Sequence, residues 1–235
     1  MIYYNEIDPY AAQWLRNLIA AGHLPAGDVD ERSIVDVQPD DLRGYTQCHF
    51  FAGIGGWAYA ARLAGIPDDF PIWTGSCPCQ PFSSAGKRRA TEDERHLWPE
   101  FYRLIRECAP GCVAGEQVDS SSALQWLDIV WEDMERKGYA FRASSLCASL
   151  LGLPARKRLF WLAESDCKGE RRGSVDAEMA RISSASGRLE TAWFTHEGVV
   201  SARDGFPERM GRLRAYGNAI VPQVAAEFLK AYLRT

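Results

Sequence analysis

Residues 47–64 read QCHFFAGIGGWAYAARLA, an apolar β-prone run that passes through a glycine-rich turn into a helical pattern. We predict a buried strand over residues 47–52, a turn at Gly53–Gly56 and a helix from about Trp57 to Ala64. Glycines let the backbone of such a turn approach a ligand closely at the N-terminus of a helix. In isolation, the same pattern fits a tight connection with no ligand equally well.

The rest of the chain alternates between strand and helix patterns, which predicts a doubly wound, mostly parallel α/β sheet of Rossmann-like type. A stretch rich in Ser, Gly, Arg and Glu interrupts this alternation at residues 164–210, where we expect a small irregular lobe. We therefore expect a main domain at residues 1–163, the lobe at 164–210, and a segment at 211–235 that returns to the main domain. The further predicted strands are 2–4, 27–29, 71–74, 112–115, 139–146 and 159–163; the predicted helices are 11–21, 97–107, 124–136 and 221–233, with a helical turn at 38–42.

The composition is that of a globular protein, since 46% of the 235 residues are hydrophobic. The odd count of seven cysteines and the lack of a secretory segment predict a reduced, cytoplasmic setting. No apolar run approaches the ~20 residues that cross a bilayer, so we expect no membrane role. The formal net charge of −4 argues weakly against indiscriminate nucleic-acid binding, although a local basic surface could still meet phosphates.

Residues 75–83 read Gly75-Ser-Cys-Pro-Cys-Gln-Pro-Phe-Ser83, and this passage contains the candidate nucleophile, Cys79. Pro78 and Pro81 fix the backbone on either side of Cys79, so the loop is stiff and presents a nucleophilic thiol. An unpaired cysteine is more often a small buried hydrophobe, but the full passage resembles the catalytic loop of the DNA cytosine-5 methyltransferases.

The resemblance extends to the glycine turn. Phe51, Gly53, Gly55 and Gly56 are similar to the element that cradles S-adenosylmethionine in this family. The Tyr216–Pro222 segment resembles the family's closing motif, which implies that Asn218 lies beside the cofactor. In the loop itself, the resemblance implies that Gln80 and Ser83 steady the backbone or contact DNA.

Two further segments resemble the family's catalytic strands. Glu116 matches the Glu of a Glu-Asn-Val element and would be the acid that protonates the cytosine ring at N3; a dry pocket would raise its pKa. On its residue type alone, it could be an ordinary surface glutamate. The neighbouring Gln117 is one carbon longer than the family's Asn. Arg158 matches the arginine that contacts the cytosine O2, and we expect Arg156 on the same strand to contact DNA. The alternative for this segment is a basic strand edge that contacts phosphates or solvent.

Only about twenty residues separate the glycine turn from Cys79, too few for the two β/α units that normally lie between them. Near the N-terminus, Glu6 and Asp28 resemble the family's ribose and adenine ligands. We therefore expect a circular permutation, which a sheet of order 3-2-1-4 permits because its first and fourth strands are neighbours. The alternative is that both residues are helix-flanking carboxylates of an N-terminal extension.

The resemblance implies an enzyme that transfers a methyl group from S-adenosylmethionine to carbon 5 of cytosine in double-stranded DNA. Its product would be S-adenosylhomocysteine, and its target base would be flipped into the pocket of Cys79, Glu116 and Arg158. Target recognition would fall in the lobe, through Arg171, Arg172 and Arg181. Its shortness predicts a short recognition sequence or a partner chain; we otherwise expect a monomer. No metal is expected, because Cys108 and Cys112 have no second ligand pair. A non-catalytic DNA-binding or decoy protein and an RNA methyltransferase remain the alternatives.

Overall fold

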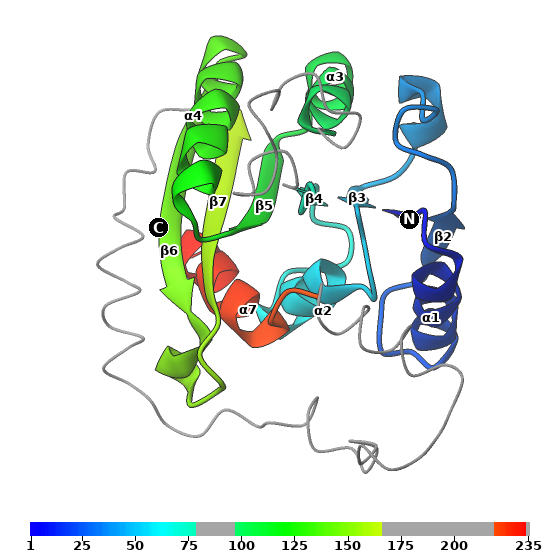
Figure 1. Ribbon diagram of the computed structural model, residues 1–235. Coiled ribbons are helices and arrows are strands. Elements are labelled where there is room, and N and C mark those ends of the chain that lie inside the picture. The colour runs from blue at the N-terminus through cyan, green and yellow to red at the C-terminus, as the bar shows by residue number, and fades with distance from the viewer. Residues whose placement is uncertain (79–96, 166–218, 234–235) are drawn as a thin grey trace.

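The computed structural model describes residues 1–78, 97–165 and 219–233, and these residues form one seven-stranded sheet between two layers of helices (Figure 1). The sheet order is β2-β1-β3-β4-β5-β7-β6. The strands are β1 (Ile2–Asn5), β2 (Gly27–Asp30), β3 (Gln47–Phe50), β4 (Trp73–Gly75), β5 (Cys112–Val118), β6 (Tyr139–Cys147) and β7 (Lys157–Ser165); the helices are α1 (Pro9–Ala20), α2 (Gly56–Leu63), α3 (Trp98–Cys108), α4 (Ser121–Arg136) and α7 (Pro222–Leu233), with short 3₁₀ turns η1 (Pro39–Leu42) and η2 (Ala148–Leu151).

The sheet is mostly parallel, which confirms the predicted fold class. Strands β2 to β5 run parallel to one another, and β7 pairs antiparallel with both β5 and β6. Strands β3 and β4 are direct neighbours. The helix after Gly56 therefore crosses straight to the strand before the cysteine loop, as the predicted strand order requires.

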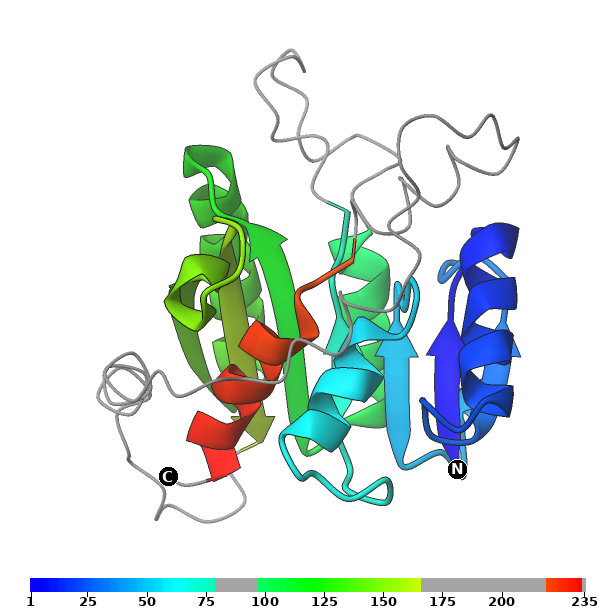
Figure 2. The ribbon, with the colours of Figure 1, turned by 90° about the horizontal axis from the view of Figure 1, so that it is seen from below.

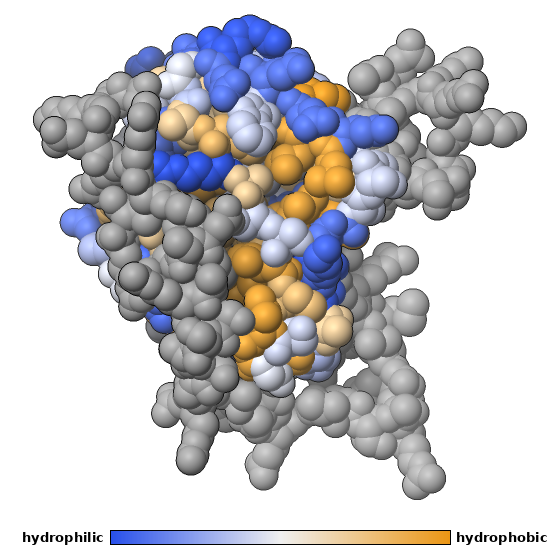
Figure 3. Space-filling view, turned by 90° about the vertical axis from the view of Figure 1, so that its left-hand side faces the viewer, coloured by the Kyte–Doolittle hydropathy of each residue, from blue (hydrophilic) through white to orange (hydrophobic). Residues whose placement is uncertain are grey.

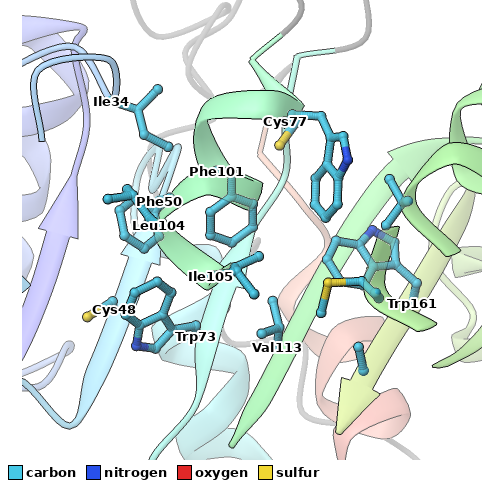
Figure 4. Close-up of a cluster of buried hydrophobic side chains, with 14 of the residues drawn as sticks. Ile34, Cys48, Phe50, Trp73, Cys77, Phe101, Leu104, Ile105, Val113 and Trp161 are labelled. Carbon is cyan, nitrogen blue, oxygen red and sulfur yellow. The ribbon is translucent and has the colours of Figure 1, made fainter. Parts of the chain in front are cut away.

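Each face of the sheet is covered by its own helices. Helices α3 and α4 cover one face, where their apolar side chains pack on Phe50, Trp73 and Trp161 (Figure 4). Helices α1, α2 and α7 cover the other face and lie side by side in front of the sheet in Figure 2. The parallel strands thus end together at one edge of a three-layer structure, where loops can gather around a ligand.

Local signals in the sequence explain where several helices begin. The Asp8 side chain accepts hydrogen bonds from the backbone N–H groups of Tyr10 and Ala11, and the Ser120 hydroxyl accepts one from Ala123.

Strand β5 runs three residues further than predicted, to Val118, and β7 runs to Ser165, past the expected domain boundary at residue 163. The extra residues of both strands are paired in the sheet, because β7 runs antiparallel to β5 and to β6 along their full lengths.

Figure 3 views the side of the molecule that carries the edge strand β6, and apolar surface lies there among hydrophilic areas. The largely exposed apolar residues of the described chain include Leu124 and Trp131 on α4 and Leu150 in η2. None of the helices in the described ranges combines the length and apolar character that crossing a membrane requires.

Candidate active site

The sheet brings several of the predicted motifs to one edge. The glycine turn follows β3, the segment leading to Cys79 follows β4, and Glu116 lies on the neighbouring strand β5. Strand β7 runs the opposite way, so that its first residues meet the last residues of β5: Arg158 pairs with Val118, and Phe160 pairs with Glu116. Segments far apart in the chain are thereby adjacent.

The buried Glu116 forms an ion pair with the partly exposed Arg158 at this edge. Glu116 is 7% exposed, and its Oε1 lies 2.8 Å from Arg158 Nε. Burial raises the pKa of Glu116 to about 7, against the opposing effect of Arg158 and Arg156. Although the guanidinium is close enough to attract the carboxylate, no described N–H or O–H group is aligned to hydrogen-bond with Oε1. The carboxyl can therefore hold a proton near neutral pH and still accept or donate one more hydrogen bond.

Gln117 ties β5 to the segment before Cys79. Its Nε2 donates to the Cys77 carbonyl over 3.1 Å, and its Oε1 accepts from the Val118 N–H. The side chain is 4% exposed, and Cys77 is itself buried in the core cluster (Figure 4). A glutamine at this position therefore spans the distance to the loop by a direct hydrogen bond.

The structure brings Glu6 to the glycine turn. Glu6 Oε2 accepts a hydrogen bond from the Gly53 N–H over 2.7 Å, its Oε1 accepts from Asp8, and burial raises its pKa. Gly53 has φ +55°, and no heavy atom lies within 4 Å of the position that a Cβ would take. Each carboxylate oxygen has a second lone pair, so this open turn fits a ligand that presents hydroxyl groups, as the ribose of S-adenosylmethionine does.

The other two glycines of the turn serve close packing. A Cβ on Gly55 would lie 2.3 Å from a methyl carbon of Leu24, and one on Gly56 would lie 2.7 Å from Ile220. Gly55 also has φ +82°, a conformation that favours glycine. Phe51 shares this left-handed backbone, with φ +51°, and its ring meets Phe101 of α3 edge-on.

Asp28 lies away from the strand end. It is the second residue of β2, exposed, and its carboxylate accepts a 2.6 Å hydrogen bond from the Tyr45 hydroxyl. Asp30 ends β2, and its carbonyl accepts from the Glu6 N–H. Within the described ranges, Asp28 forms no hydrogen bond or ion pair with Glu6, and the adenine role of Asp28 stays a prediction.

A cavity of about 690 Å³ joins three of the predicted motifs. Arg156 donates from Nη2 to the Ala219 carbonyl over 3.0 Å, and so links β7 to the C-terminal segment. Arg156, which we expected to contact DNA, thus binds the protein's own backbone. The lining residues are Ile54 and Gly56 of the glycine turn, Ala148, residues 153–158, and residues 219–222.

Other predicted residues lie outside the described ranges: Cys79, Gln80, Ser83, Arg171, Arg172, Arg181 and Asn218. Within the described ranges, no three His, Cys, Asp or Glu side chains are grouped as metal ligands.

Sequence reasoning missed Trp57, the residue directly after the glycine turn. Its indole N–H donates to the Ser76 hydroxyl over 3.0 Å, just beyond the end of β4. A tryptophan in the first turn of the helix that follows the glycine turn was the available signal.

Comparisons with known proteins agree with this geometry. Residues 1–171 match the family model of the C-5 cytosine-specific DNA methylases. The chain is 31% identical over 169 residues to the type II methyltransferase M.HhaI of Haemophilus parahaemolyticus, a match that covers 55% of this chain and 51% of that protein. It is 32% identical over 109 residues to M.HgiDI of Herpetosiphon aurantiacus, covering 46% of this chain and 33% of that protein. The chain thus spans about half or less of these relatives.

A solved structure shares the fold. It is described as that of a DNA modification methyltransferase encoded within a prophage of E. coli, and it aligns with a TM-score of 0.56 at 15% identity over 99% of this chain and 92% of that one. The family model covers well over half of the sequence, and it includes both the glycine turn and the Glu116–Arg158 pair. This chain belongs to the C-5 cytosine-specific DNA methylase family.

Proposed function

We propose that this protein transfers a methyl group from S-adenosylmethionine to carbon 5 of cytosine in double-stranded DNA. The observation that carries the proposal is the buried Glu116, paired with Arg158, on the strand next to the segment that leads to Cys79. The family and its type II relatives support the same reaction.

Cytosine C5 is a poor nucleophile until a thiolate adds at C6. In our proposal, the Cys79 sulfur forms a bond to C6 of a base flipped out of the duplex, while Glu116 delivers its proton to N3, where electron density accumulates. The pKa of about 7 suits Glu116 to this task, because the carboxyl still holds its proton near neutral pH. Arg158 would donate to the cytosine O2 and help to polarise the ring.

Glu6 and the turn at Gly53 would hold the cofactor. Bound S-adenosylmethionine would supply an electrophilic methyl group to the activated C5. Transfer of the C5 proton to water, return of the N3 proton to Glu116 and expulsion of the Cys79 thiolate from C6 would then restore the aromatic base and free the enzyme.

We further propose that the ribose and adenine segments are permuted to the N-terminus. The support is topological. In the order β2-β1-β3-β4, strand β3 carries the glycine turn and takes the place of the first strand in the expected order 3-2-1-4. Strands β1 and β2 then take the places of the second and third strands, although they precede β3 in the chain. Glu6 follows β1 directly and reaches the turn after β3, as a ribose ligand on a second strand would.

The test is incubation with methyl-labelled S-adenosylmethionine and mixed-sequence duplex DNA, followed by nucleoside analysis, for the wild type, Cys79→Ser and Glu116→Gln. We expect label in 5-methylcytosine for the wild type, and its loss in Cys79→Ser. Parallel reactions with RNA separate the substrate classes. If DNA stays unlabelled while the cofactor binds, the proposal is wrong, and labelled RNA would identify the other substrate.

A further inference from the structure

Trp57 contacts three parts of the candidate site at once. It lies in the first turn of α2, directly after Gly55 and Gly56, and is 4% exposed. Its indole N–H donates to the Ser76 hydroxyl over 3.0 Å. Its ring meets Phe160 of β7 edge-on, with the centroids 6.0 Å apart.

Each of these contacts leads to a group used in the proposed reaction. Ser76 is the first residue beyond β4 and stands three positions before Cys79. Phe160 is the direct partner of Glu116 across the β5–β7 ladder. The Trp57 side chain therefore links the helix that follows the glycine turn to the approach to Cys79 and to β7, the strand that pairs with the acid-bearing β5.

Residues 76–78, which lead to Cys79 in the sequence, are restrained one after another. The Ser76 hydroxyl accepts a hydrogen bond from Trp57, the Cys77 carbonyl accepts one from Gln117, and the ring of Pro78 fixes its own φ. The first part of the approach to Cys79 is therefore anchored to both α2 and β5.

We infer that Trp57 is a positioning residue for the proposed reaction: its indole N–H fixes Ser76 and so holds the described start of the segment that leads to Cys79 beside the glycine turn. This inference rests on the proposed function. It is specific to the N–H group, because phenylalanine would supply the same apolar ring against Phe160 without a donor.

The variants are Trp57→Phe, which removes the donor, Ser76→Ala, which removes the acceptor, and the two combined. Trp98→Phe is the matched control, because Trp98 is equally buried and its indole N–H donates to Asp133 between α3 and α4, outside the site. This control separates loss of the Ser76 bond from the general effect of removing one buried indole donor.

The first measurement is exchange of the C5 hydrogen of cytosine in DNA without cofactor, which reports thiol addition at C6. We expect Trp57→Phe and Ser76→Ala each to slow exchange by about 2- to 10-fold, the effect of one lost hydrogen bond. The double variant should be no slower than the slower single one, and the affinity for S-adenosylmethionine should stay unchanged.

The second measurement is amide hydrogen–deuterium exchange of the peptide that contains Ser76 and Cys77, which needs no activity. We expect faster exchange in both single variants and no change in Trp98→Phe. A wild type that fails to exchange the C5 hydrogen contradicts the proposed function, while the peptide data still decide the role of Trp57. Unchanged peptide exchange in Trp57→Phe, or equal effects in Trp98→Phe, would overturn the inference.

Discussion

Replacing Glu116 with glutamine should change how the stability of this protein depends on pH. The folded state holds the carboxyl proton up to about pH 7, whereas the reference value for an exposed glutamate is 4.5. Between these values the folded state binds more protons than the unfolded state, so the free energy of unfolding falls as the pH rises. At 1.36 kcal/mol per pH unit, the wild type should lose about 3 kcal/mol through this group, fully by pH 7 to 8.

Glutamine is nearly the same shape and stays neutral at every pH, so the Glu116→Gln variant lacks this loss. Arg158 faces a neutral partner in the variant and in the wild type at low pH, and its contribution therefore largely cancels in the comparison. The stability difference between the two proteins should move by about 3 kcal/mol in favour of the variant between about pH 4 and about pH 8.

Urea unfolding at several pH values measures this difference. Glu132→Gln is the control, since Glu132 lies on the exposed side of α4 and its carboxyl stays in water when the protein folds. A stability difference for Glu116→Gln that stays flat across this pH range would refute the argument that burial keeps the carboxyl protonated.

Two other substitutions and one titration test separate parts of the structure. Gln117→Ala removes the bond to the buried Cys77 carbonyl and should lower stability by about 1–3 kcal/mol in denaturant unfolding, with an unchanged denaturant slope. Gly115→Ala would place a Cβ 2.3 Å from Trp161 and 2.6 Å from the Gly75 carbonyl, so we expect a loss of several kcal/mol or no folding, judged by circular dichroism. Burial lowers the pKa of His49 to about 3, so its NMR signals should not titrate between about pH 5 and 8; a midpoint near 6.5 would contradict this.

The sequence predicted the helices well because they depend on strong local patterns, and the order 3-2-1-4 that the resemblance implied placed β3 and β4 side by side, as they are in the structure. The alternation of apolar strands and amphipathic helices led to the doubly wound sheet, and the short interval between the glycine turn and the cysteine loop led to β3 and β4 as neighbours. Helices α1 and α4 begin only a few residues before their predicted starts, directly after the capping residues Asp8 and Ser120.

The end of β5 was harder to predict, because polar residues there are buried. Glu116 and Gln117 interrupt the apolar run, so the sequence pattern ended the strand at Gly115. In the fold, Arg158 and the Cys77 carbonyl receive these two side chains. Because these partners come from distant segments of the chain, they could not be predicted from the local hydrophobic pattern. The bond of Arg156 to Ala219 was missed for the same reason.

The antiparallel placement of β7 has a consequence for the order in which the sheet assembles. Strands β6 and β7 are joined by the short connection at residues 148–156. In contrast, the much longer stretch of residues 76–111, which includes α3, separates β4 from its partner β5. Short loops close at a lower entropic cost, so we expect the β6–β7 hairpin to form as a unit and then dock on β5. In this order of assembly, Glu116 would lie at an open sheet edge in contact with water until the hairpin docks. The carboxyl would then leave water in the same step that brings Arg158 to it, so its charge would not be buried without a partner.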